Sequence, residues 1–465
     1  MRPIRAKALA LGLDIRMVFK TLKARAFFPT SLMLVLSVNG FAQTLDTANL
    51  DQFLDRLAEK NKAMGSLVIA KDGNVLYARA IGYGQINGAE MKPLTAASRF
   101  RIASITKTYA AVMILQLVEE GKLKLTDTLD KFFPQVPNAQ KITILQILSH
   151  RSGIPNVTRD QATWKPGEPV TKDEILALIV KGAPEFEPDT ESSYSNSGYF
   201  LLGLILEKLT GKTFNQAVQE RINAKIGLAD TYLATGRIDV NKGEALTYAN
   251  NGGGWEHWRQ GFETHPSIGF QLISTAGDMA KFIGALFERK LISQDSLNQM
   301  KTIRDGEGLG IVPFTYAGKT FYGNNGGGDN YGAWIAYQPE ERLAISYATN
   351  AKVYPVANIV SGVVDIYYNR PFEIPSLESI AVSPEILDKY VGVYSRAGAP
   401  NKWTVTRDGG TLFLQPGSED AIAVEATADD KFQIFNGIVT FEFDAAKNQM
   451  LLKRGPLPMI FTKER

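Results

Sequence analysis

The spacing of hydrophobic positions predicts a helix and then a hairpin near the start of the chain. Residues 50–63 carry apolar side chains three and four positions apart, as in an amphipathic helix. The apolar runs 66–70 and 75–78 then flank Lys71-Asp72-Gly73-Asn74, a pattern typical of a β-hairpin. A second hairpin is predicted at residues 332–348, where two apolar runs flank a Pro-containing turn. Strands are therefore expected towards both ends of the first 370 residues.

Between the two hairpins the pattern predicts helices that are apolar on nearly every face. One covers residues 104–118 before Gly121, and another covers residues 198–209 before Gly211. Helices of this kind belong in the centre of a domain. A further helix over residues 356–368 follows the second hairpin. The predicted fold class is α/β: an antiparallel sheet completed by both ends of the domain, flanked by helices, with a helical lobe inserted.

Beyond residue 380 the pattern changes to short strands and tight turns. We interpret residues 43–370 as the large domain, 371–379 as a Pro-containing linker, and 380–465 as a small antiparallel barrel or meander. Five strands are predicted there, at residues 391–394, 403–406, 411–414, 439–443 and 450–452.

Charge sets the first 42 residues apart from the rest. They hold seven basic residues and one acidic residue, Asp14, a net charge of +6. Since the whole chain has a formal net charge of +3, residues 43–465 carry a net charge of −3, which argues against a nucleic-acid partner. The basic stretch precedes a short apolar run and Gly40-Phe41-Ala42, which places small residues at the −3 and −1 positions of a cleavage site before Gln43. Residues 1–42 are therefore predicted to be an export signal, and the mature protein to be periplasmic or secreted. The run is too short to span a bilayer.

Several kinds of chemistry are excluded by composition. The chain has no cysteine, so it can form no thiolate nucleophile, no thiolate metal site and no disulfide. Its three histidines, at positions 150, 257 and 265, lack the spacing of metal ligands. We therefore expect no metal and no cofactor.

Ser104-Ile105-Thr106-Lys107 is the candidate catalytic segment. Residues three apart share one face of a helix, so the hydroxyl of Ser104 and the amine of Lys107 are expected to meet. A serine hydroxyl becomes an effective nucleophile when a neighbouring base takes its proton, and lysine can be that base. A third polar group is expected in Tyr194-Ser195-Asn196, directly before the second apolar helix.

Together these segments resemble the motifs of the penicillin-recognising serine hydrolases, which include class C β-lactamases, D-alanyl-D-alanine carboxypeptidases, D-aminopeptidases and related esterases. Order and spacing agree over roughly residues 50–368. The resemblance rests on four segments: Arg99 to Lys107, Ile142 to Ile154, Glu187 to Tyr199, and Ser274 to Met279.

The resemblance implies a β-lactamase/transpeptidase-like fold and a role for each matching residue. Ser104 would be the acylated nucleophile and Lys107 its activating base. Tyr194 would relay protons to the leaving group, and Asn196 would bind the substrate carbonyl. The backbone N–H groups of Ser104 and Gly327 would form the oxyanion hole.

The chain departs from the family at the third motif, Tyr322 to Gly328. Asn324 stands where the family has Lys or His, followed by Asn325 and Gly326. The substitution keeps a hydrogen-bonding group and removes a positive charge that would favour a substrate carboxylate. Asn324, Gly326 and Gly327 are the candidate substrate-binding residues beside Asn196.

Two further candidates have competing interpretations. His150 is a possible general base, but its Leu-Ser-His-Arg-Ser-Gly setting favours a structural role in a turn. Trp255 and Trp258, in a Gly-rich stretch with His257, suit either a substrate pocket or local packing.

The predicted function is that of an exported serine hydrolase that forms an acyl-enzyme on Ser104 and cleaves an amide or ester bond. The substrate would be a small molecule or peptide, with cell-wall peptides one source. Two alternatives stay open: a carboxylesterase without peptidase or β-lactamase activity, and a catalytically weak envelope protein that binds a ligand.

Overall fold

The computed structural model describes residues 45–464 apart from 160–170, 235, 251–253, 259–269, 329, 376, 379, 397, 399–401, 418–420, 435–438 and 454–457. The predicted export signal, residues 1–42, lies outside the described residues, and so does His265. Across the described part of the chain, no helix has both the length and the apolar content needed to cross a bilayer.

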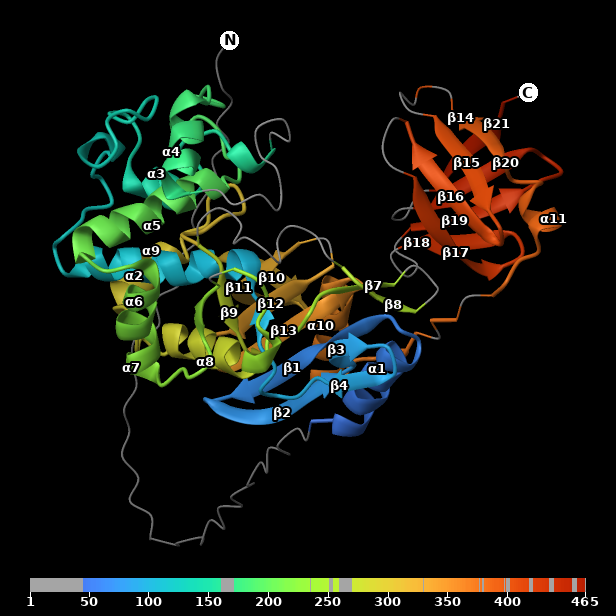
Figure 1. Ribbon diagram of the computed structural model, residues 1–465, viewed down its shortest axis with the longest axis horizontal. Coiled ribbons are helices and arrows are strands. Elements are labelled where there is room, and N and C mark those ends of the chain that lie inside the picture. The colour runs from blue at the N-terminus through green and yellow to red at the C-terminus, as the bar shows by residue number, and fades with distance from the viewer. Residues whose placement is uncertain are drawn as a thin grey trace, which may run out of the picture. The chain divides into compact units, whose positions relative to one another are not determined.

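A six-stranded antiparallel sheet forms the centre of the large domain (Figure 1). Two adjacent strands of the sheet come from opposite ends of the domain, since Leu67 pairs with Tyr347. Both predicted hairpins are present, and the predicted α/β fold class is confirmed. The strands in spatial order are β10 (Val312–Tyr316), β11 (Lys319–Gly327), β12 (Gly332–Gln338), β13 (Leu343–Lys352), β1 (Ala63–Lys71) and β2 (Asn74–Ile81).

Each face of the sheet is covered because the strands β1, β12 and β13 are buried on both sides. Helices α1 (Thr47–Glu59) and α10 (Val356–Tyr367) pack on one face around a core that includes Leu67. Helix α8 (Ala276–Phe287) packs on the other face, together with side chains such as Val68. The sheet is therefore the middle layer of an α/β/α sandwich.

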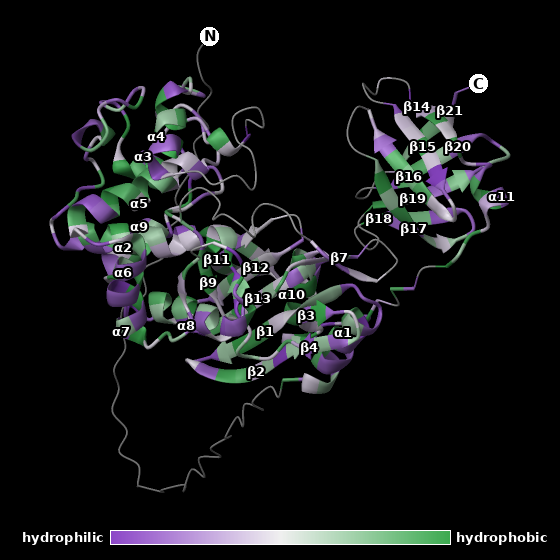
Figure 2. Ribbon diagram, in the orientation of Figure 1, coloured by the Kyte–Doolittle hydropathy of each residue, from purple (hydrophilic) through white to green (hydrophobic). Residues whose placement is uncertain are grey.

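The second face leads into the helical lobe, whose centre is α2 (Thr106–Glu119) and α5 (Asn196–Thr210). Both helices lie where the sequence predicted them, and both carry mostly hydrophobic residues (Figure 2). Helix α5 ends at Gly211, whose φ of 67° is left-handed. The smaller elements are α3 (Ile144–Leu148), α4 (Lys172–Lys181), α6 (Phe214–Val218), α7 (Ala224–Ile226), α9 (Gln294–Met300), β3 (Tyr83–Asn87), β4 (Glu90–Pro93), β5 (Phe100–Arg101), β6 (Tyr232–Leu233), β7 (Tyr248–Asn250), β8 (Trp255–His257) and β9 (Leu272–Ser274).

The C-terminal region forms a closed eight-stranded antiparallel barrel, preceded by the short helix α11 (Pro384–Leu387). The barrel has its own core, in which Phe441 and Met450 are fully buried. All five predicted strands are present, but the sequence interpretation missed three others, β17, β18 and β21. The strands are β14 (Gly392–Ser395), β15 (Trp403–Asp408), β16 (Thr411–Pro416), β17 (Ile422–Ala428), β18 (Lys431–Ile434), β19 (Val439–Asp444), β20 (Gln449–Lys453) and β21 (Pro458–Lys463).

Candidate active site

Ser104 lies in a single 3-10 turn, Ala103–Ile105, that leads directly into α2. Ala103 has a φ of 44°, a left-handed conformation that is uncommon for a residue with a side chain. This turn directs the hydroxyl of Ser104 towards the amine of Lys107 in the first turn of α2. The two atoms lie 3.1 Å apart, as the spacing predicted.

Tyr194 and Asn196 complete the group around the serine. The hydroxyl of Tyr194 lies 2.6 Å from Ser104 Oγ, and Lys107 Nζ donates to Asn196 Oδ1 at 2.8 Å. The ammonium also lies 4.7 Å from the centre of the Tyr194 ring. The structure thus brings all four predicted residues, Ser104, Lys107, Tyr194 and Asn196, into one hydrogen-bonded cluster.

The start of α5 holds Tyr194 and Asn196 in place through the residue between them. Ser195 caps the helix: its Oγ accepts the Gly198 N–H at 3.2 Å and donates to the Ile154 carbonyl at 3.1 Å. Asn196 is held in turn by Thr158, whose Oγ1 accepts from Asn196 Nδ2 at 3.0 Å. Sequence reasoning missed Thr158, because a single threonine in a loop gives no pattern.

His150 supports this same segment. Its Nδ1 accepts the backbone N–H of Ser195 at 3.1 Å, and its ring lies 4.6 Å from the ring of Tyr194. Burial, together with the smaller effect of the nearby Lys107 ammonium, lowers the pKa of His150 to about 3. The imidazole is therefore neutral at ordinary pH with its Nδ1 already occupied, which matches the structural role predicted for it rather than that of a general base.

Strand β11 passes the catalytic turn at very close range. A β-carbon placed on Gly326 would lie 2.5 Å from the Ile102 carbonyl oxygen and 2.6 Å from the Ser104 nitrogen, so only glycine fits. Strand β10 pairs with β11 only as far as Gly323, which leaves the following residues open on that side. Neighbouring residues of an antiparallel strand direct their N–H groups to opposite sides. The Gly328 N–H donates to the Tyr331 carbonyl across the turn to β12, so the Gly327 N–H points away from β12.

Asn324 lies in the wall of this site with its amide already engaged. Its Nδ2 is 3.1 Å from both Thr108 Oγ1 and the Gly310 carbonyl, and its Oδ1 accepts the Asn325 N–H at 2.8 Å. The side chain therefore contributes to the shape of the pocket and brings no charge. Thr108, on α2, is a second residue that sequence reasoning did not single out.

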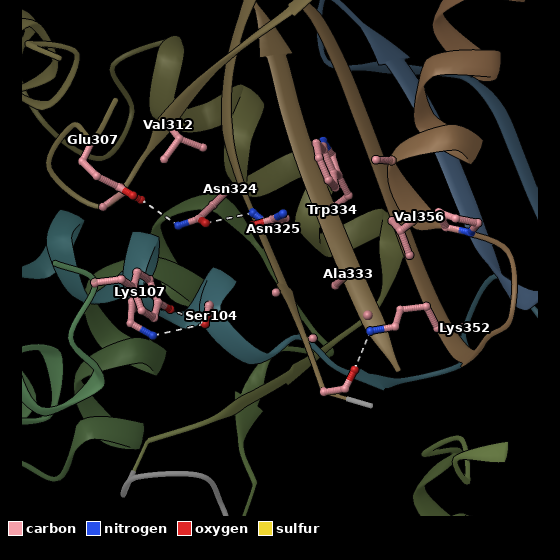
Figure 3. A pocket seen from close by; sticks show the side chains of 18 of the residues that line it. Ser104, Lys107, Glu307, Val312, Asn324, Asn325, Ala333, Trp334, Lys352 and Val356 are labelled. Atoms are coloured by element: carbon pink, nitrogen blue, oxygen red, sulfur yellow. Dashed lines mark hydrogen bonds between the residues drawn. The ribbon is translucent and has the colours of Figure 1, made fainter. Parts of the chain in front are cut away.

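These groups line a cavity of about 1040 Å³ (Figure 3). Its lining includes Ser104, Lys107, Tyr194, His150, Asn324, Gly326, Gly327, Glu307, Lys352, Trp334 and Val356. Of the aromatic candidates, Trp255 packs against the larger core, which favours its packing interpretation. Among the described residues, no group of three His, Asp or Glu side chains is arranged to hold a metal ion.

The comparisons with known proteins agree with the motifs. The family model described as Beta-lactamase matches residues 50–360. Penicillin-binding protein 4* of Bacillus subtilis (strain 168) is 25% identical over 444 residues, which cover 88% of this chain and 96% of that protein.

Two solved structures extend the likeness to the fold. An octameric penicillin-binding protein homologue from Pyrococcus abyssi has a TM-score of 0.63 at 25% identity, covering 90% of this chain and all of that chain. The D-amino acid amidase from Ochrobactrum anthropi SV3, complexed with D-phenylalanine, has a TM-score of 0.61 at 25% identity, covering 70% and 99%.

Proposed function

Since this chain belongs to the β-lactamase family of serine hydrolases, we propose that it hydrolyses an amide or ester bond through an acyl-enzyme on Ser104. The observation that carries this proposal is the cluster in which Ser104 Oγ lies 3.1 Å from Lys107 Nζ and 2.6 Å from the Tyr194 hydroxyl. A serine with a base and a proton relay within hydrogen-bond distance is arranged for nucleophilic catalysis.

In the acylation step Lys107 acts as the neutral amine: Ser104 Oγ bonds to the substrate carbonyl carbon while Lys107 Nζ takes the hydroxyl proton. The electron pair displaced from the carbonyl moves onto its oxygen, which the N–H groups of Ser104 and Gly327 stabilise. Tyr194 passes the proton to the leaving amine or alcohol as the C–N or C–O bond breaks. The acyl group is then an ester on Ser104.

Water completes the cycle. Its oxygen attacks the ester carbonyl, Tyr194 removes a proton from it, and the bond to Ser104 Oγ breaks. The proton returns to Oγ and the carboxylic acid leaves. Asn196 keeps Lys107 aimed at Ser104 through its 2.8 Å contact.

The neutral Asn324 favours substrates without a carboxylate beside the scissile bond. Its amide is held by Thr108 and Gly310, and it offers no positive charge. Penicillins and D-Ala-D-Ala peptides carry such a carboxylate, whereas simple esters and amino-acid amides need not. This observation supports an amidase or esterase over an efficient β-lactamase.

We also propose that the protein acts outside the cytoplasm, on the basis of residues 1–42. If the segment is cleaved as we infer, the mature protein begins at Gln43. Amino-terminal sequencing of protein recovered from the periplasm or medium tests this, and an uncleaved Met1 or Met17 terminus would contradict it.

Intact-mass spectrometry of the protein treated with a fluorophosphonate tests the enzyme proposal. We expect one adduct on the wild type, none on Ser104→Ala, and a labelling rate reduced at least about a hundredfold in Lys107→Ala, because the base is lost. A parallel sample with a penicillin separates the candidate activities. A wild type that never acquires an adduct would show that the site does not work as a nucleophile.

A further inference from the structure

A half-buried carboxylate lies in the catalytic cavity with no hydrogen-bond partner among the described residues. Glu307 lines the same cavity as Ser104 and Lys107, in the segment between α9 and β10. Its side chain forms no hydrogen bond or ion pair with any residue that the structure describes. Lys107 directs its ammonium to Ser104 Oγ and Asn196 Oδ1 instead. A carboxylate removed from bulk water in this way favours a cation from outside the protein.

The backbone fixes Glu307 firmly. Arg304 and Glu307 exchange two backbone hydrogen bonds, of 2.9 and 3.1 Å, around Asp305 and Gly306, whose φ values of 52° and 85° are typical of a type I′ turn. Asp305 also forms an ion pair with the buried guanidinium of Arg151. A carboxylate held on such a short turn is pre-organised to bind a ligand group.

A second hollow, of about 580 Å³, joins the cavity at this point. Tyr194 and Glu307 line both, and the second hollow adds Glu191, Asp305, Arg151, Thr190 and Ser192. The guanidinium of Arg151 is already used, because it pairs with Asp305 and with Asp189. The approach to Glu307 is therefore predominantly negative.

The labelled lining residues lie on two sides of β11 (Figure 3). Glu307, Asn324 and Lys107 lie on one side of β11, whereas Trp334, Val356 and Lys352 lie on the other. Lys352 donates to the Gly328 carbonyl at 2.7 Å. A substrate cation bound by Glu307 would therefore lie on the same side of β11 as Lys107 and Asn324.

We propose that Glu307 is a specificity-determining residue that selects substrates carrying an ammonium group close to the bond attacked by Ser104. The substrate class is an amide or ester of an amino acid whose amino group is free. This inference rests on the proposed function. Burial raises the pKa of Glu307, and the Lys107 ammonium opposes that rise, which is consistent with a carboxylate that is stabilised further when a cation binds.

The test compares two p-nitroanilides that differ only in charge. Alanine p-nitroanilide, in both D and L forms, carries an ammonium where isobutyric p-nitroanilide carries a methyl group. At pH 6.5 we expect the wild type to favour at least one alanine form in kcat/KM. Glu307→Gln should reduce that preference at least about tenfold, as expected for a hydrogen bond to a charged group, and change the rate on the neutral anilide less than about twofold.

A matched control removes a carboxylate that lines neither hollow. Asp295→Asn, in α9, should keep the wild-type preference. An equal loss on both anilides in Glu307→Gln would mean that Glu307 acts through Lys107 or the fold, and would overturn the proposal. So would a wild-type preference for the neutral anilide.

A second measurement keeps the test decisive if turnover is slow. Alaninamide should protect Ser104 from a fluorophosphonate better than isobutyramide does, and Glu307→Gln should remove the difference. If the two amides slow the labelling of the wild type equally, the role of Glu307 is overturned but the proposed function is not. A wild type that is never labelled overturns the proposed function, and the two failures are thereby distinguished.

Discussion

The turn that holds Ser104 is closely approached by a glycine on a different element. Strand β11 can pass so near the Ser104 turn because Gly326 has no side chain. Gly327, whose N–H is the proposed oxyanion donor, is the next residue of the same strand. The left-handed Ala103, beside Ser104, belongs to the same close contact, because its Cβ lies 3.1 Å from where a β-carbon on Gly326 would be. Strain of this kind is usual at catalytic turns.

Gly326→Ala is therefore expected to damage the site more than the fold. The added carbon would collide with Ile102 and Ser104, at a cost of about 1–3 kcal/mol in the free energy of unfolding. The rate of Ser104 labelling should fall about a hundredfold, because the turn must move. As a control, Gly284→Ala in α8 places its carbon 3.9 Å from the Tyr337 ring and should stabilise the protein by up to about 1 kcal/mol without altering the rate. Equal labelling rates in the two variants would contradict this.

His150 should make stability depend on pH. The folded state keeps it neutral down to about pH 3, whereas the unfolded chain binds a proton below its ordinary pKa of about 6.5. The unfolded state therefore binds more protons as pH falls, and stability decreases by up to about 1.4 kcal/mol per pH unit below 6.5.

His150→Asn should flatten this decrease. Asparagine does not titrate, and it tolerates the φ of 58° found at this position. Urea unfolding of the wild type and of His150→Asn between pH 7.5 and pH 5 measures the difference in stability. The contributions of carboxylates cancel in that difference, because both proteins contain the same carboxylates. Parallel pH profiles would show that His150 is protonated in the folded state.

Residues whose roles depend on long-range packing were beyond sequence reasoning. The meeting of Ser104 and Lys107 could be predicted from their spacing, and that of Tyr194 and Asn196 with them from the family resemblance. Glu307 stands in a run of Gly and charged residues typical of an exposed turn. Glu307 becomes buried only when that turn packs against α2. The contact is close, because a β-carbon placed on Gly310 would lie 3.1 Å from the Lys107 carbonyl oxygen.

At the scale of elements, the start of α5 is both a helix cap and part of the site. Ser195 satisfies the Gly198 N–H while its neighbours, Tyr194 and Asn196, face Ser104 and Lys107. Helices α2 and α5 could be predicted because they are apolar all round. Strands β17, β18 and β21 were missed because their alternation is short and rests partly on alanine and polar residues, which bury little surface.

Ser195→Ala tests this double role. Loss of the cap should cost about 1 kcal/mol in the free energy of unfolding, and the rate of Ser104 labelling should fall at least about tenfold because the flanking residues lose their anchor. Thr213→Ala is the matched control, since Thr213 caps α6 in the same way away from the catalytic cluster. It should lose similar stability and keep the labelling rate. Equal labelling rates in the two variants would show that the Ser195 cap does not help to position the residues around Ser104.

At the scale of the whole molecule, the chain has separate hydrophobic cores. The two clusters of the sheet and helical lobe take residues from 50 to 377, and the barrel cluster begins at Val382. A domain with its own core can fold alone.

A chain that ends at Glu378 should therefore remain folded. We expect its thermal midpoint and its rate of Ser104 labelling to stay within about 3 °C and about twofold of those of the full chain. Circular dichroism and intact-mass spectrometry measure the two quantities. A folded but unreactive protein would show that the barrel contributes to the site.

The pairing of β1 with β13 places nearly the whole domain between two adjacent strands. During synthesis β1 and β2 leave the ribosome before the other strands of the sheet, but the strand that pairs with β1 on its other side ends only at Lys352. Until then one side of β1 is an open edge, and closing so long a loop makes folding slow. The sheet can therefore be completed only after residue 352 has been made, and we expect β1 to remain an unpaired edge until then.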